Sequence, residues 1–213
     1  MPQKEAMLQE QFEDLPQQYE AANLGMWTFL ATEILFFGGL FVSYAIYRHF
    51  YNADFICGVK HTLIFYGTLN SSLLLTSGLT MALAVQAATE NRTKVIAPLL
   101  VVTICLGLAF LACKGLEYRV DLQDHVLPGQ GFDPTLPLHA QLFFWLYWAM
   151  TALHAIHMIV GIGLLTVMTV MASRGAFSAQ YYTPLEIVGL YWAFVDIVWI
   201  YLYPLLYLIG RHS

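Results

Sequence analysis

Five long apolar stretches constrain what this chain of 213 residues can fold into. An α-helix rises 1.5 Å per residue, so about 20 apolar residues cross the roughly 30 Å hydrocarbon layer of a bilayer. In lipid only helices and closed barrels satisfy every backbone hydrogen bond, and stretches of this length favour helices. The sequence therefore predicts an all-α integral membrane protein, a five-helix transmembrane bundle. The expected spans lie at about 24–47, 62–88, 95–114, 139–172 and 185–209.

Composition supports a membrane protein. Hydrophobic residues make up 59% of the chain and charged residues 11%, whereas soluble domains average about 25% charged residues. The nine Lys and Arg residues are scattered singly, without the basic stripe of a nucleic-acid-binding protein, so no nucleic-acid partner is expected. The three cysteines form no CxxC pair, and no metal site is expected from them.

The chain is expected to divide into a short arm and one bundle. Residues 1–23 are rich in Asp and Glu and contain no apolar core segment, so they read as an acidic arm and not as a signal peptide. Residues 24–213 are expected to form a single transmembrane bundle. Five spans place the two termini on opposite sides of the membrane. Basic residues are divided almost evenly between the two sets of loops, so the positive-inside rule gives no orientation.

Four ionisable residues are expected at membrane depth: Glu33 in the first span, His154 and His157 in the fourth, and Asp196 in the fifth. Such a residue costs about 2.5–3.5 kcal/mol on insertion scales, so it usually has a partner or a function. A spacing of three residues puts the two histidines on one helix face. Two interpretations stay open: a proton relay or buried carboxylate–imidazole pair, and separate structural hydrogen bonds. Haem binding is not expected, because no other histidine lies at this depth on a different helix.

One further acid lies near the end of the third span. Glu117 follows Lys114 by three residues and precedes Arg119 by two. We expect it either to pair with one of these bases at the membrane surface or to be solvated at the end of the helix.

Small and polar residues mark positions where helices could pack closely. Glycine lets helix backbones approach each other, although it is also simply frequent in membrane helices. The candidates for such packing positions are Asn70, Gly78 and Gly161.

Each of the five spans contains a different short motif. They read GMWTFLATEILFF at 25–37, LNSSLLLTSG at 69–78, KGLEY at 114–118, TALHAIHMIVG at 151–161 and YWAFVDIVW at 191–199. Each motif is weak alone, but together they cover about residues 24–208 and every span. The chain resembles the haem-copper (cytochrome c type) oxidase subunit III family, in its short five-helix bacterial form.

The resemblance implies a non-catalytic subunit that stabilises the catalytic subunit of a proton-pumping terminal oxidase and supports its proton uptake. The whole complex reduces dioxygen to water in aerobic respiration. No catalytic residue, metal or cofactor is then expected in this chain, and haem and copper belong to partner subunits. Expected partners are catalytic subunit I, subunits II and IV, a respiratory supercomplex and membrane lipids, including bound phospholipid. The expected location is the bacterial inner membrane, multi-pass, with the N-terminus cytoplasmic and the C-terminus outside.

The same resemblance suggests a role for one acid. Glu33 matches the membrane-buried carboxylate of the family, and we expect it to be hydrogen-bonded to His154 or His157.

The chain also departs from the family pattern. Larger members have seven helices, and the two-helix arm that forms their lipid-filled cleft is absent from this pattern. In addition, Ala193 stands where the motif commonly has His, and Ala155 where it commonly has Gly. Three alternatives remain. One is a subunit of the same family associated with a nitric oxide reductase. Another is a subunit of the quinol-oxidising branch of the same superfamily, on which this sequence is silent because the electron donor binds other subunits. The last is a small proton-coupled transporter with the buried acids and histidines as its coupling site.

Overall fold

The computed structural model describes residues 11–211 except 13, 130 and 180. Six α-helices and a terminal π-helical turn make up this part of the chain, and five of the elements are long and apolar enough to cross a membrane. The predicted all-α membrane bundle is therefore confirmed. The elements are α2 (Leu15–Phe50), α3 (Asn52–His61), α4 (Ile64–Thr89), α5 (Thr93–Gln123), α6 (Ala140–Ser173), α7 (Thr183–Tyr203) and η1 (Pro204–Leu208).

The first span begins earlier than its apolar pattern indicates. α2 starts at Leu15 and not near residue 24, because Asp14 caps it: the Asp14 carboxylate accepts a hydrogen bond from the backbone N–H of Gln17 at 2.8 Å. Pro16, in the first turn, suits a helix start because its missing N–H would have no partner there. The expected arm at 1–23 is thus too long, and its residues 1–10 lie outside the described residues.

The third span ends later than expected. α5 continues to Gln123, well past the predicted end at residue 114. Polar residues at 114, 117 and 121 recur at helical spacing and are buried, so they continue the inward face of the helix beyond its apolar run. A charged residue here marks the interior of the bundle and not the end of a helix.

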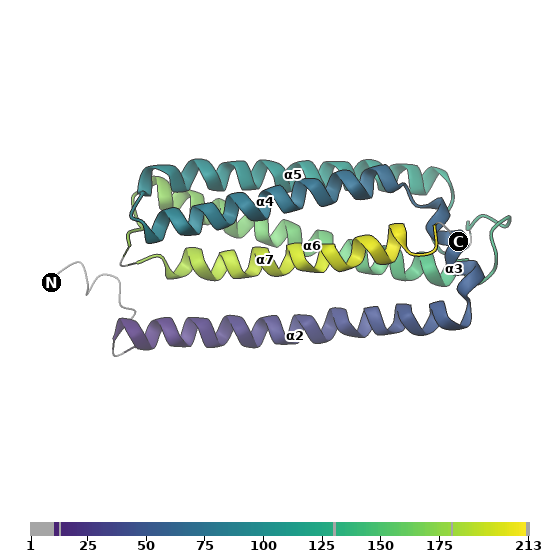
Figure 1. Ribbon diagram of the computed structural model, residues 1–213, viewed down its shortest axis with the longest axis horizontal. Helices are drawn as coiled ribbons and strands as arrows, with labels where there is room; N and C mark the ends of the chain where they lie inside the picture. The colour runs from purple at the N-terminus through teal and green to yellow at the C-terminus, as the bar shows by residue number, and fades with distance from the viewer. Residues whose placement is uncertain (1–10, 13, 130, 180, 212–213) are drawn as a thin grey trace.

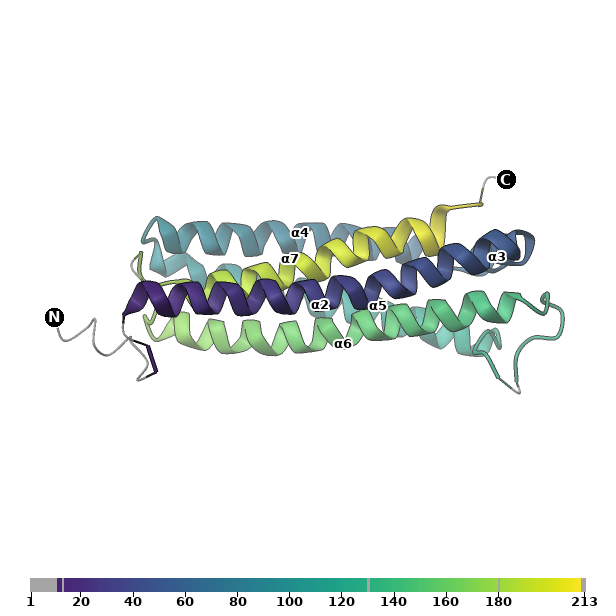
Figure 2. The same cartoon turned by 90° about the horizontal axis from the view of Figure 1, so that it is seen from below.

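The helices form a core of four with a fifth at its edge. α4 and α5 are an antiparallel hairpin, closed by a tight turn in which Asn91 takes a left-handed conformation (φ 59°). Figures 1 and 2 show α2 running along α6 and α7 on the outside of the bundle, and α3 lying across the end where α2 finishes. In the most apolar window of each span, 56% of α7 residues but 17% of α2 residues are buried. α7 is therefore the central helix and α2 a peripheral one.

Two tryptophans of α7 fill the core and tie it to α4. Trp192 and Trp199 are almost fully buried, and their indole N–H groups donate to the hydroxyls of Ser77 at 3.2 Å and Ser71 at 3.1 Å. A Cβ atom added at Gly161 would lie 2.9 Å from the Trp192 ring. Because real Cβ contacts are longer, glycine at this position lets α6 approach α7.

Candidate functional site

The structure brings together one pair of the residues expected at membrane depth. Nε2 of His157 on α6 lies 3.2 Å from Oε2 of Glu33 on α2, an ion-pair distance without the geometry of a hydrogen bond. The ring of His157 also packs against Phe37, with centroids 5.5 Å apart. A polar contact thus joins the peripheral helix to the core, at side chains that are mostly buried (14% and 19% exposed).

The second nitrogen of the His157 ring decides the chemistry of this pair. Nδ1 lies 2.9 Å from the carbonyl oxygen of Leu153. A carbonyl only accepts, so Nδ1 carries a hydrogen, and Nε2 carries one only when the ring is charged. The contact with Glu33 is therefore favourable when one proton lies between them, on either the carboxyl or Nε2. The two side chains therefore have a geometry in which they can share one proton.

His154 has a different environment from His157, although the two were expected on one face. It is 1% exposed and packs between Phe110 and Trp199, with centroid distances of 5.4 Å and 5.2 Å. Neither of its ring nitrogens has a hydrogen-bond partner among the described residues. Of the two histidines expected to hydrogen-bond to Glu33, only His157 lies beside it, and the contact lacks the geometry of a hydrogen bond.

Asp196 of α7 faces α4. One of its carboxylate oxygens lies 2.5 Å from the position that a Cβ of Gly78 would occupy. The other oxygen, and both polar atoms of the fully buried Asn70, have no hydrogen-bond partner in the described part of the chain. Gly78 therefore makes room for a carboxylate, in addition to bringing two helices together.

A third group of polar residues was only partly foreseen. Lys114 (2% exposed) and Glu117 (0%) of α5 form a buried ion pair at 2.9 Å. The ammonium group also donates to the hydroxyls of Tyr147 on α6 at 2.9 Å and Tyr207 on η1 at 2.7 Å. All three N–H groups of the lysine are thereby satisfied inside the protein. Glu117 is not at a solvated helix end, and its pair with Lys114 lies in the core of the bundle.

The tyrosines extend this group to a second acid. Tyr207 donates to Oε1 of Glu117 at 2.7 Å, and Tyr147 donates to Asp121 at 2.8 Å. Asp121 is 5% exposed. We call these five residues the Lys114 cluster: Lys114, Glu117, Asp121, Tyr147 and Tyr207. Because most of their bonds are charge-assisted and join α5, α6 and η1, the cluster stabilises the bundle at the end near α3.

Sequence reasoning missed Lys114, Asp121, Tyr147 and Tyr207 as interior residues. A usable signal was the spacing of 114, 117 and 121, which follows one helix face. No signal pointed to Tyr207, because the π-helical turn that begins at Pro204 changes the helical phase there.

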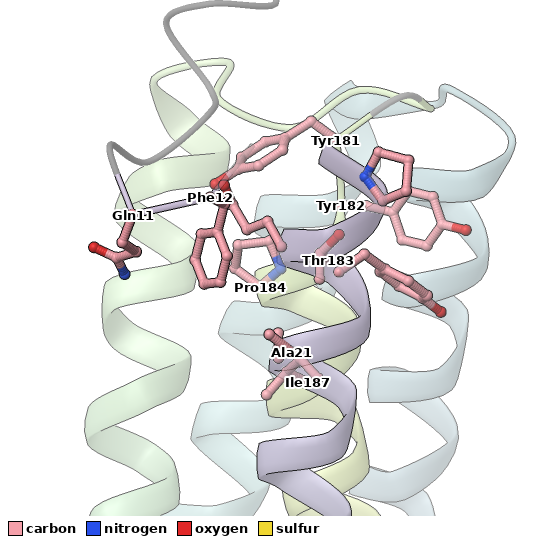
Figure 3. A pocket seen from close by; sticks show the side chains of 12 residues that line it. Gln11, Phe12, Ala21, Tyr181, Tyr182, Thr183, Pro184 and Ile187 are labelled. Atoms are coloured by element: carbon pink, nitrogen blue, oxygen red, sulfur yellow. The ribbon is translucent and has the colours of Figure 1, made fainter. Parts of the chain in front are cut away.

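The described residues hold no group of three or more His, Cys, Asp or Glu side chains that could bind a metal. A hollow of about 750 Å³ lies where α2 and α7 begin, and none of the predicted residues lines it. Figure 3 shows its aromatic walls, with Phe12 ahead of α2 and Tyr181 and Tyr182 ahead of α7. Such rings suit the headgroup layer of a membrane.

Comparison with known proteins fits this arrangement. The family model for cytochrome c oxidase subunit III matches residues 5–211, nearly the whole chain. The chain belongs to the cytochrome c oxidase subunit III family. Within the family it is a non-catalytic subunit III of a haem-copper oxidase, a multi-pass membrane protein that associates with other oxidase subunits.

Two relatives illustrate the likeness. The cytochrome bo(3) ubiquinol oxidase subunit 3 of Pseudomonas aeruginosa is 31% identical over 189 residues, which cover 87% of this chain and 84% of the relative. A probable quinol oxidase subunit 3 of Staphylococcus aureus is 27% identical over 194 residues, 90% of each chain. The subunit III family lacks redox cofactors of its own.

Proposed function

We propose that this chain stabilises catalytic subunit I of a quinol-oxidising haem-copper oxidase and supports proton uptake by that subunit. Haem and copper then reside in the partner subunits, and subunits II and IV complete the complex. The names of both relatives support quinol as the electron donor.

The observation that carries the stabilising role is the internal satisfaction of the Lys114 cluster. A path for protons or ions needs groups that can exchange partners, whereas each N–H of Lys114 is already bonded within the chain. Breaking a buried ion pair is costly, so this cluster favours one rigid arrangement of α5, α6 and η1. Such a bundle suits a scaffold for a neighbouring subunit.

The Glu33–His157 pair supports the proton-related role. The pair can share one proton at the edge of the bundle, and its side chains are not completely enclosed. A proton held there can influence the charge felt by an adjacent subunit. Glu33 is therefore proposed as a tuning group, whose loss slows proton uptake without stopping oxygen reduction.

We further propose that the chain lies in the bacterial inner membrane with its N-terminus in the cytoplasm. The end of the bundle that carries α3, the Lys114 cluster and the C-terminus then faces outward. Cysteine labelling of exposed residues at each end, in intact cells and in inverted vesicles, tests this orientation.

The main experiment is purification through a tag on this chain. We expect haem-containing subunits to co-elute, oxygen consumption to be supported by a quinol and not by cytochrome c, and deletion of the chain to shorten the activity lifetime of the remaining complex. If the co-eluting proteins reduce nitric oxide and do not consume oxygen with a quinol, the proposal of a quinol-oxidising oxidase is overturned. Elution of the chain alone, without haem, would overturn the scaffold role.

A further inference from the structure

The Lys114 cluster has one hydrogen-bond contact more than it has hydrogen atoms to fill. Its polar groups make six contacts: Lys114 with Glu117, Tyr147 and Tyr207, Tyr147 with Glu117 and Asp121, and Tyr207 with Glu117. The ammonium group supplies three hydrogens and each of the two phenols supplies one, which makes five. With both acids ionised, one contact between two oxygen atoms therefore lacks a hydrogen.

The shortage falls on Tyr147. Its hydroxyl oxygen lies 2.8 Å from Oδ2 of Asp121 and 3.1 Å from Oε1 of Glu117, and it accepts a hydrogen bond from Lys114 at 2.9 Å. A phenol has one hydrogen, so it donates to only one of the two carboxylates at a time. The other carboxylate oxygen then faces the phenol oxygen with no hydrogen between them, an arrangement that leaves a buried acceptor without its partner.

The charges of the cluster are also unbalanced. Lys114, Glu117 and Asp121 are 2%, 0% and 5% exposed. Two carboxylates and one ammonium group leave one uncompensated negative charge in the interior of the bundle. Such a charge is costly, and an acid in this situation becomes neutral by taking up a proton. The count of hydrogens and the count of charges thus both require one additional proton.

Two further groups lie near Asp121, both on α5, and neither removes the shortage. Tyr118 donates its hydrogen to the hydroxyl of Thr151 at 2.7 Å, so it supplies none to the cluster. Asp124 is exposed and adds negative charge beside Asp121, which favours protonation. Together with the cluster itself, these are the titratable groups that interact with Asp121 from α5, α6 and η1 in the described part of the chain.

Asp121 is the acid in the better position to take the proton. Glu117 contacts the ammonium group at 2.9 Å and also accepts from Tyr207 at 2.7 Å, and both partners favour its ionised form. Asp121 makes no ion pair with Lys114 in the described structure, and its donor is the neutral phenol of Tyr147. A proton on Oδ2 lets Asp121 donate to Tyr147, which then donates to Glu117. All six contacts are then filled and the cluster is neutral.

The site is open to water at one end and closed at the other. Asp121 lies in the last turn of α5, and residues 123–125 that follow it are exposed. One helical turn beyond the lysine, the buried ring of Phe110 packs edge-on against Trp199 with centroids 4.8 Å apart. A proton can therefore enter from the end of the bundle near α3 and meets packed aromatic rings beyond the cluster.

We propose that the Lys114 cluster binds one proton, which Asp121 carries and donates to Tyr147. The proton comes from water: one O–H bond forms at Oδ2 of Asp121, and Tyr147 turns its own hydrogen toward Glu117. The cluster stores this proton and does not conduct it, because the rings of Phe110 and Trp199 close the inner side. The site is separate from the contact of Glu33 with His157, and it makes the rigidity of α5, α6 and η1 depend on pH.

Infrared difference spectroscopy on the purified complex that contains this chain tests the proposal. A neutral carboxyl group has a C=O stretching band that an ionised carboxylate lacks. We expect the wild-type complex to show such a band and the Asp121→Asn complex to lack it. The band should move to lower frequency when aspartate carries heavy carbon in its side-chain carboxyl. Asp124→Asn, which removes an exposed acid three residues away, should leave the band in place.

The pH dependence of thermal unfolding in detergent gives a second measurement. At neutral pH the folded cluster holds a proton that the unfolded chain releases, so the midpoint should rise as the pH is lowered. Asp121→Asn has a permanent N–H donor in place of the proton and should lose at least half of this dependence, whereas Asp124→Asn should keep it. Haem content reports assembly of each complex. If the Asp121→Asn complex does not assemble, Tyr147→Phe replaces it, because loss of the phenol must shift the same carboxyl band.

Three results would overturn the proposal. Identical spectra of the wild-type and Asp121→Asn complexes would show that Asp121 is ionised. A band that moves with labelled glutamate and not with labelled aspartate would place the proton on Glu117. Equal pH dependence of unfolding in the wild type and Asp121→Asn would show that folding takes up no proton at this site. The scaffold role is judged by co-elution of haem-containing subunits, so its failure is distinguishable from each of these results.

Discussion

His157 of α6 lies 3.2 Å from Glu33 of α2, and this contact crosses between the core of the bundle and its peripheral helix. α2 has little buried surface of its own, so a polar contact at its middle contributes an unusually large share of its attachment. In membranes a polar side-chain contact between helices is worth about 0.6 kcal/mol on average and about 1.7 at most. The contact therefore orients α2 more than it stabilises the whole protein.

A Glu33→Gln substitution tests the tuning role. Glutamine keeps the size of the side chain and can still bond to Nε2 of His157, but it cannot exchange a proton. We expect the complex to assemble with normal haem content and to retain most of its oxygen consumption, while proton uptake slows. Complete loss of oxygen reduction in an assembled complex would favour a direct proton path through this chain.

The two histidines of α6 should respond differently to the same change. His154→Leu removes two ring nitrogens that have no partner among the described residues, so the change should be neutral or slightly stabilising. His157→Leu removes the contact with Glu33 and leaves a carboxyl without its partner, at a cost of about 1–3 kcal/mol. Thermal release of the tagged chain from the complex measures both. A larger loss for the His154 variant contradicts the assignment of His157 as the partner.

The Lys114 cluster should be the most sensitive part of the bundle. Lys114→Met leaves Glu117 buried without its cation, which costs about 3–5 kcal/mol. The double variant Lys114→Met, Glu117→Met removes both charges and should recover part of that loss. Chain abundance in membranes and the midpoint of thermal unfolding in detergent measure the effect. If the single and double variants are equally unstable, packing and not charge pairing explains the role of Lys114.

Gly78 should be intolerant of even a methyl group. Its Cβ would lie 2.5 Å from a carboxylate oxygen of Asp196, so Gly78→Ala forces a shift that costs about 1–3 kcal/mol. Gly163→Ala is the matched control, because its Cβ meets no atom within 4 Å. Adding Asp196→Ala to Gly78→Ala should restore stability, since the double variant removes the clashing group. Non-additivity in this cycle measures the contact directly.

The sequence was a good guide to the apolar parts of the fold and a weaker guide to their polar ends. Apolar length alone located all five spans, because lipid forces every backbone group into a helix. The apolar pattern placed the start of the first span near residue 24 and the end of the third near residue 114, whereas α2 begins at Leu15 and α5 ends at Gln123. A helix that is capped or hydrogen-bonded within the bundle extends beyond its apolar residues. The cost of burial in a membrane drew attention to Glu33 and His157, yet it did not tell which of two neighbouring histidines lies beside the acid.

The sequence by itself determined the class, the number of spans and the family, and it drew attention to some of the ionisable residues inside the bundle, since each of these depends on local composition or on motifs within a single helix. Only the tertiary structure decided which partners those residues have. Lys114 and Tyr207 lie 93 residues apart and meet because α5 packs beside the π-helical turn after α7. Likewise, Arg48 reaches the carbonyl of Ile209 across the end of the bundle. Such pairings depend on how helices rotate and cross, which is set by the packing of whole surfaces and is not encoded at any one position.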